Sequence, residues 1–144
     1  ASSSDSAAKV VITAVGADRV GIVSDLTQRI LDNEGNVEDS AMARLAGSFA
    51  TVILVSLPPT RVSGLRDSVT KINGLTSSVL EATPAEPVRR KFRNVEMKGA
   101  DNPGLLRTVT SYFSQRGINI EKMETWCEDA PFGGTTLFNM KALV

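Results

Sequence analysis

The sequence repeats itself at an offset of 83 residues, and this repeat constrains the fold more than any other feature. The segment that starts at Gly16 (GADRVGIV) superposes without a gap on the segment that starts at Gly99 (GADNPGLL), and 99 − 16 = 83. The same offset places Asn36 on Asn119 and Glu38 on Glu121. Because turn, cap and core residue types match in one order, we interpret the chain as two copies of one folding unit.

The overall composition is that of a globular protein with room for two small domains. The chain has 144 residues, of which 42% are hydrophobic and 22% are charged. Sixteen basic and sixteen acidic residues give a net charge of zero. A neutral chain without a long apolar run lacks the charge or the span that nucleic acid or a bilayer requires. We therefore expect no direct nucleic-acid partner and no membrane.

The chain contains no histidine and only one cysteine, Cys127. The missing histidine removes the commonest general base and the commonest metal ligand, so we expect no enzyme, no catalytic residues, no cofactor and no metal. A single thiol forms no internal disulfide and suits a reducing compartment, which indicates the cytoplasm. Residues 1–8 are rich in serine and alanine and are expected to form a disordered N-terminal tail. A remnant of a removed organelle transit peptide is a second interpretation of this tail.

The first copy, residues 9–82, has the pattern of a β-α-β-β-α-β unit. Apolar and β-branched runs predict strands over residues 9–15, 36–44, 49–57 and 76–82. Gly47 marks the turn between the second strand and the third. This order is the ferredoxin-like α+β plan, in which two helices cover one face of a four-stranded antiparallel sheet. The other face then needs a cover, and a second copy or a second chain would supply it.

Helical spacing of apolar residues locates the two helices of this copy. We expect Asp18 to cap the first helix and a left-handed Gly35 to end it. Asn73 and Gly74 follow the second helix. The predicted inner faces are Ile22, Val23, Leu26 and Ile30 in the first helix, and Val62, Leu65, Val69 and Ile72 in the second.

Residues 83–90 contain two prolines among small and charged residues and are expected to form a linker. The second copy, residues 91–144, repeats the first strand, the first helix and two further strands, predicted over residues 93–98, 118–126 and 135–143. Asn102 and Pro103 form a cap and first-turn pair for its helix, whose predicted inner face is Leu105, Leu106, Val109 and Phe113. No residues remain for a second helix or a fourth strand, so we expect this unit to be incomplete through truncation at its C-terminus.

The strand-to-helix loops carry the residues best suited to hold a ligand. A helix N-terminus offers unpaired N–H groups and a partial positive charge to a carboxylate, and glycine allows close approach. A nearby asparagine can donate to a carboxylate and accept from an ammonium group. Helix capping and close packing would also explain these residues without any ligand. The candidate ligand-binding residues are Gly16, Asp18, Arg19, Gly21, Ile22 and Asn36 in the first copy, and Asp101, Asn102, Pro103, Gly104, Leu105 and Asn119 in the second.

These loops resemble the signature of the ACT domain. Asp18-Arg19-Val20-Gly21-Ile22 is followed by Asn36, and Asp101-Asn102-Pro103-Gly104-Leu105 is followed at the same spacing by Asn119. Residues 10–19 and 36–40 are especially similar to tandem ACT proteins of the glycine cleavage system transcriptional repressor type. The first loop departs from the usual pattern because Val20 stands where the second loop has Pro103.

The resemblance implies two tandem ACT units, an amino acid bound at the first strand–helix loop near an interface between units, and a homodimer. It also implies a separate protein regulator as partner, in the control of glycine or one-carbon metabolism. Two alternatives remain at this point: a regulatory ACT fragment of a larger metabolic enzyme, and a protein-interaction scaffold that binds no ligand.

Overall fold

The computed structural model describes residues 7–82, 91–100, 103–129 and 134–144. The chain divides into two compact units, Ala1–Ala85 (unit 1) and Glu86–Val144 (unit 2). Most of the expected N-terminal tail and the whole expected linker, residues 83–90, lie outside the described residues. Each unit is described below by itself.

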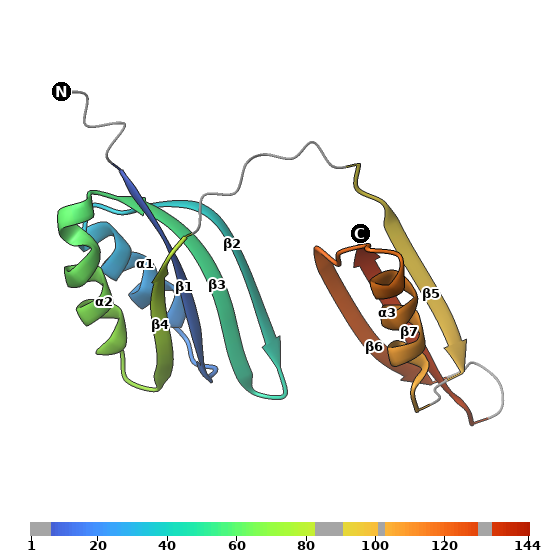
Figure 1. Ribbon diagram of the computed structural model, residues 1–144. Helices are drawn as coiled ribbons and strands as arrows, with labels where there is room; N and C mark the ends of the chain where they lie inside the picture. Colours follow the sequence, from blue (N-terminus) through green and yellow to red (C-terminus); the bar gives the residue numbers. More distant parts are fainter. Residues whose placement is uncertain (1–6, 83–90, 101–102, 130–133) are drawn as a thin grey trace. The chain divides into compact units, whose positions relative to one another are not determined.

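Unit 1 follows the order β1 (Ala8–Ala17), α1 (Ile22–Asp32), β2 (Asn36–Leu45), β3 (Ser48–Leu57), α2 (Val62–Thr70) and β4 (Leu75–Glu81). A short 3-10 turn, Pro59–Arg61, leads into α2. The four strands form one antiparallel sheet in the order β2-β3-β1-β4. Figure 1 shows α1 and α2 on the same face of this sheet. The predicted ferredoxin-like plan is confirmed for this unit.

The core of unit 1 lies between the sheet and the two helices. The predicted inner-face residues Ile22, Leu26, Ile30, Leu65, Val69 and Ile72 are all buried, whereas Val23 and Val62 are partly buried at its margin. Asn33 joins the helices, because its Nδ2 donates to the Arg29 carbonyl at 2.8 Å and to the Ser68 hydroxyl at 3.2 Å. The remaining core residues are Val10, Ile12, Phe49, Ile53, Val55, Leu57 and Val79.

The turns of unit 1 confirm one sequence prediction and correct another. Ala46 and Gly47 both have positive φ, of 48° and 76°, which gives a two-residue β2–β3 hairpin of the kind that Gly47 predicts. Gly35 is not left-handed; Glu34 is, with φ 59°. Glycine is required at 35 because an added Cβ would lie 2.8 Å from Ile30 Cγ2 and 3.0 Å from both the Ile30 carbonyl oxygen and Val55 Cγ1.

Unit 2 contains β5 (Asn94–Ala100), α3 (Leu105–Gln115), β6 (Lys122–Asp129) and β7 (Thr136–Leu143), with antiparallel strands in the order β5-β7-β6. This order matches β1-β3-β2 of unit 1. The buried core consists of Phe113, Met140 and Ala142, with partly buried side chains such as Val109 around them. Leu106 was predicted to face inward but is 36% exposed. Residues 130–133 of the predicted β6–β7 loop lie outside the described residues.

The strand predicted over residues 118–126 begins later than expected, at Lys122. Gly117, with φ 67°, ends α3, and the Ile118 N–H donates back to the Phe113 carbonyl at 2.9 Å. This N–H is therefore used by the helix end and cannot start a strand ladder. Ile118 and Ile120 instead pack against the core of unit 2.

Candidate functional site

Both candidate loops start their helix at a left-handed glycine. Gly21 has φ 87° and ψ −1°, and Gly104 has φ 90° and ψ −6°. The first helical bonds also match, since Asp25 N–H donates to the Gly21 carbonyl and Thr108 N–H to the Gly104 carbonyl, both at 2.9 Å. A residue with a Cβ would pay about 1–2 kcal/mol for this conformation. Because glycine has no side chain, neither residue at the helix start caps the first-turn N–H groups.

Asp18 does not cap α1, so that prediction is wrong. Its Oδ1 accepts a hydrogen bond from Arg44 Nε at 3.0 Å, and its backbone N–H donates to the Gly47 carbonyl at 2.9 Å. Asp18 therefore ties the β1–α1 loop to the β2–β3 hairpin and leaves the start of the helix open. Likewise, Pro103 is not in the first turn of α3, which begins at Leu105. Asp101 and Asn102 lie outside the described residues.

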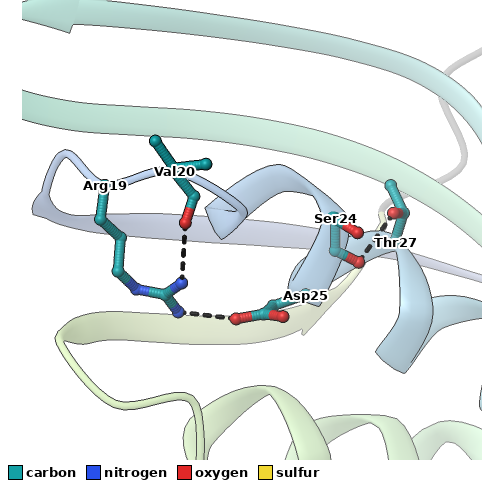
Figure 2. A network of polar contacts seen from close by, with 5 residues as sticks. All are labelled: Arg19, Val20, Ser24, Asp25 and Thr27. Carbon is teal, nitrogen blue, oxygen red and sulfur yellow. Dashed lines mark hydrogen bonds and ion pairs between the residues drawn. The ribbon is translucent and has the colours of Figure 1, made fainter.

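Arg19 spans the start of α1 (Figure 2). Its Nη2 donates to Asp25 Oδ2 at 2.7 Å, and its Nη1 donates to the Val20 carbonyl at 3.4 Å. Asp25 lies in the first helical turn, where the helix dipole favours a negative charge. About half of each side chain in the pair stays exposed, 42% for Arg19 and 51% for Asp25. In unit 2 the residue at the Asp25 position is Thr108, so this ion pair belongs to the first loop alone.

The structure gives packing reasons for two of the candidate residues. A Cβ on Gly16 would collide with the Gly74 carbonyl oxygen, so glycine is needed there for the β1–β4 contact. Ile22 is 1% exposed and belongs to the core. At the matching position in unit 2, Leu105 is partly buried.

Asn36 lies at the opposite end of the sheet from the β1–α1 loop. Asn36 pairs with Ser56, and Ser56 pairs with Lys9 near the start of β1. Lys9 and Ala17 are eight residues apart, roughly 26 Å at about 3.3 Å per residue. One unit therefore does not bring its loop and its asparagine together. Unit 2 repeats this arrangement, because Glu121 N–H donates to the Leu143 carbonyl beside the start of β5.

Each asparagine donates to a glutamate two residues later, in both units. Asn36 Nδ2 lies 3.4 Å from Glu38 Oε1, and Asn119 Nδ2 lies 3.2 Å from Glu121 Oε1. The Ser56 hydroxyl also donates to Glu38 Oε1 at 2.6 Å. The hydrogen bond from Ser56 lowers the pKa of Glu38 most, and the bond from Asn36 and the charge of Lys9 lower it further.

The sequence analysis did not select either glutamate as a site residue, although the repeat places Glu38 on Glu121. Each Asn–Glu pair forms a small polar site with an anionic carboxylate and an amide oxygen that can accept. Both groups are suited to an ammonium ion.

A hollow of about 350 Å³ adjoins the second pair, lined by Lys91, Phe92, Gly117, Ile118, Asn119, Glu121 and Val144. This volume is at the lower end of the range for small-molecule sites. A larger hollow of about 440 Å³ lies on the unit 2 sheet around Lys141, and its lining includes neither Gly104 nor Asn119. In this hollow Lys141 Nζ lies 3.8 Å from Glu96 Oε1, and we assign no amino acid to the hollow.

The described residues contain neither a cluster of metal ligands nor a helix that could span a membrane. Within residues 7–82, 91–100, 103–129 and 134–144, no three His, Cys, Asp or Glu side chains are grouped so that they could hold a metal ion. None of the helices in the described part of the chain is both long enough and apolar enough to cross a membrane.

Comparison with known protein families assigns both units to one domain type. Residues 8–82 and residues 93–140 each match a family model described as the ACT domain. The glycine cleavage system transcriptional repressors of Escherichia coli (strain K12) and Shigella flexneri are each 31% identical to this chain over 120 residues, which are 79% of the chain. The matched region is 62% of the length of each of these relatives.

Among solved structures, an unknown protein from Galdieria sulphuraria is similar to this chain. It is 34% identical to this chain, with a TM-score of 0.78 over 95% of this chain and 81% of that one. The agreement covers both units and is consistent with the tandem arrangement inferred from the repeat.

Proposed function

Since this chain belongs to the ACT domain family and contains two ACT units in tandem, we propose that it is an amino-acid-binding regulatory protein. In this proposal the chain senses a small ligand and modulates a partner protein. It has no catalytic role, and its setting is the cytoplasm, as its single thiol favours. The similarity to glycine cleavage system repressors supports a role in the control of glycine or one-carbon metabolism.

The observation that carries this proposal is the start of the first helix in each unit. Gly21 and Gly104 adopt one backbone conformation, and neither provides a side chain to cap the exposed N–H groups. In unit 1 the nearest acid on the loop, Asp18, is held by Arg44 instead. The first turn of each helix can therefore accept the carboxylate of a ligand through several N–H groups and the helix dipole.

The ammonium group of the same ligand would be held by an Asn–Glu pair. Glu38 stays ionised because its pKa is lowered, and Asn36 Nδ2 is already engaged with it, which leaves Asn36 Oδ1 to accept. Because the loop and the pair lie at opposite ends of one sheet, a single amino acid reaches both only when two units, or two chains, are placed end to end. Ligand binding would then stabilise one arrangement of units over another.

This linkage is the proposed regulatory mechanism. A ligand that bridges two units shifts their arrangement and so changes the surface that a partner protein meets. The free energy that couples ligand to partner equals the difference in ligand affinity between the two arrangements. The same logic makes the ligand favour a homodimer if the two units that share it belong to different chains.

Calorimetric titration of the full chain with each of the twenty amino acids tests the proposal. We expect at least one to bind, and we expect Gly21→Ala and Asn36→Ala each to weaken it. A hydrogen bond to a charged group is worth about 1.5–3 kcal/mol, which corresponds to roughly 10- to 150-fold in Kd. The matched controls Gly134→Ala, also left-handed at φ 62°, and Asn73→Ala, an exposed turn residue, should bind normally.

Two results would oppose the proposal. If none of the twenty amino acids gives a binding signal, the chain is better described as a scaffold that binds no amino acid. Binding that survives Gly21→Ala and Asn36→Ala unchanged would place the ligand elsewhere on the chain.

A further inference from the structure

The outer face of the unit 2 sheet carries a buried amide. Met140 and Ala142 of β7 belong to the core, so Asn139, which alternates with them, faces the other side of the sheet. On that face Asn139 pairs with Lys98 of β5 and with Trp126 of β6. Asn139 is 7% exposed, whereas Trp126 is 43% exposed. The Asn139 Nδ2 atom is buried and has no hydrogen-bond partner among the described residues. Such a group destabilises a fold and needs an explanation.

The repeat shows that the fold does not require this amide. At the offset of 83, Trp126 corresponds to Ala43. Ala43 pairs with Ala50 of β3, and Trp126 pairs with Asn139 in the same way, on β7. Unit 1 therefore has two alanines where unit 2 has an aromatic ring and an amide. Because the smaller residues form the same row of the same sheet, the ring and the amide indicate a role other than folding.

A carboxylate lies beside the amide. Glu128 follows Trp126 by two residues on β6, so both are on the outer face, and its Oε1 lies 2.8 Å from Lys98 Nζ. The hydrogen bond from Lys98 lowers the pKa of Glu128 most, and the nearby amide of Asn139 lowers it further. That amide is nevertheless not placed to complete a hydrogen bond of its own within the described part of the chain. Its NH₂ group is on the side of Glu128, because the amide oxygen would be repelled there.

We propose that Trp126, Asn139 and Glu128 form a binding site for a planar ring with a cyclic amide edge, the chemistry of an oxopurine base. The ring stacks on the exposed indole of Trp126. The N–H of the cyclic amide donates to the Glu128 carboxylate, and the adjacent carbonyl oxygen accepts from Asn139 Nδ2. The site includes neither strand-to-helix loop and neither Asn–Glu pair, so the inference holds or fails separately from amino-acid binding.

The face is hollowed beside this row, which leaves room for the rest of the ligand. The next row along the three strands, roughly 7 Å away at about 3.3 Å per residue, consists of Glu96, Lys141 and Glu124. With Lys122, these residues line the hollow of about 440 Å³, a volume within the range of small-molecule sites. The two lysines and the two glutamates cancel in charge. An uncharged polar substituent such as a ribose therefore suits the hollow better than a phosphate.

Titration of the full chain with inosine, followed by the fluorescence of Trp126, tests the site. Trp126 is the single tryptophan, so a stacked ring should quench the signal, and the quenching should saturate. Inosine methylated on the nitrogen of its cyclic amide keeps the ring but loses the donor. It should bind about tenfold more weakly. Inosine monophosphate should bind no more tightly than inosine, because the hollow has no net charge.

Two variants copy unit 1 and should fold. Asn139→Ala and Trp126→Ala introduce the residue that unit 1 carries at each position, and equilibrium dialysis should show that each weakens inosine binding by about tenfold or more. Asn139→Ala should also leave the Tm unchanged or raise it, because it removes a buried donor without a partner. Tyr112→Ala is the matched control, since Tyr112 lies on α3 and is 52% exposed. It should bind inosine normally.

Several results would overturn the proposal. Inosine that produces no saturable quenching would show that the site does not bind this ring. Unchanged binding in Asn139→Ala, or equal binding of the methylated compound, would show that the cyclic amide edge is not recognised. Tighter binding of the monophosphate would contradict the assignment of an uncharged substituent. A lower Tm in Asn139→Ala would show that the amide serves the fold.

Discussion

Gly16 and Gly99 occupy the same position of the repeat, yet alanine should have opposite effects at the two sites. A Cβ at Gly16 would collide with the Gly74 carbonyl oxygen, a backbone atom, and would lie 2.9 Å from Leu75 Cδ2. Neither contact opens without disturbing the β1–β4 ladder, where Gly16 pairs with Leu75. At Gly99 the nearest atom is Leu105 Cδ2 at 3.9 Å, which is ordinary contact. The space around each glycine, and not its shared position in the repeat, therefore determines how much an alanine there destabilises the fold.

Overpacking of this kind costs about 1–3 kcal/mol, and a collision with backbone belongs at the upper end of that range. For a unit of 60–100 residues, 1 kcal/mol corresponds to about 4–8 °C in Tm, so Gly16→Ala should lower the Tm of unit 1 by roughly 10–20 °C. Gly99→Ala should be neutral or stabilise by up to about 0.5–1 kcal/mol, because alanine loses less backbone entropy than glycine on folding.

Thermal unfolding followed by two signals measures this difference. Circular dichroism reports both units, whereas the fluorescence of Trp126, the single tryptophan, follows unit 2. Gly16→Ala should shift the first signal to lower temperature more than the second. Equal stability losses in the two alanine variants would refute the packing argument, since they would show that the shared motif carries the cost.

Two more predictions concern unit 1. Gly64→Ala should not gain the full ~1 kcal/mol of helix propensity, because the new Cβ would lie 2.7 Å from Asn33 Oδ1. The gain should return when Asn33→Ala is also present. If urea denaturation shows that the effects of the two substitutions on the free energy of unfolding are additive, this prediction is contradicted. The Glu38 carboxyl should titrate below its ordinary pKa, and Ser56→Ala should raise that pKa. The associated stability is therefore present above the ordinary glutamate pKa and is lost as pH falls through the lowered one. An NMR titration with no change on Ser56→Ala would count against this assignment.

The sequence predicted the fold well wherever a local signal and the tertiary structure agree. The apolar spacing of α1 and α2, the strand pattern of unit 1 and the turn at Gly47 are short-range features, and all were confirmed. They agree because helix period, strand alternation and positive φ act on the same chain segments that the core selects.

Two of the errors, at Asp18 and at Gly35, involve contacts with residues that are distant in the sequence. The sequence predicts that Asp18 caps a helix, but Arg44, 26 residues away, donates a hydrogen bond to the Asp18 carboxylate instead. The sequence predicts that Gly35 ends α1 in the left-handed conformation, but Glu34 adopts that conformation instead. Gly35 is closely surrounded by Val55 and the end of α1. The contacts of Asp18 with Arg44 and of Gly35 with Val55 have no signature within a local window of sequence.

The candidate site shows the same limit. The repeat indicated the two loops and the two asparagines, but sequence spacing suggested that each loop lies beside its own asparagine. Strand direction separates them by the length of the sheet, and only the paired register of β1, β2 and β3 reveals it. Glu38 was overlooked as a site residue because its role depends on Ser56, a neighbour across the strands.

The most direct test of amino-acid sensing is an NMR titration of the ¹⁵N-labelled full chain with each of the twenty amino acids. The account predicts that one or more of them shifts the amide signals of Ile22, Val23 and Ser24 at the start of α1. The same ligand should shift the side-chain amide of Asn36, at the far end of the sheet, with the same saturation curve. Shifts at neither place with any amino acid, or saturation of one place without the other, would contradict a ligand shared between two units.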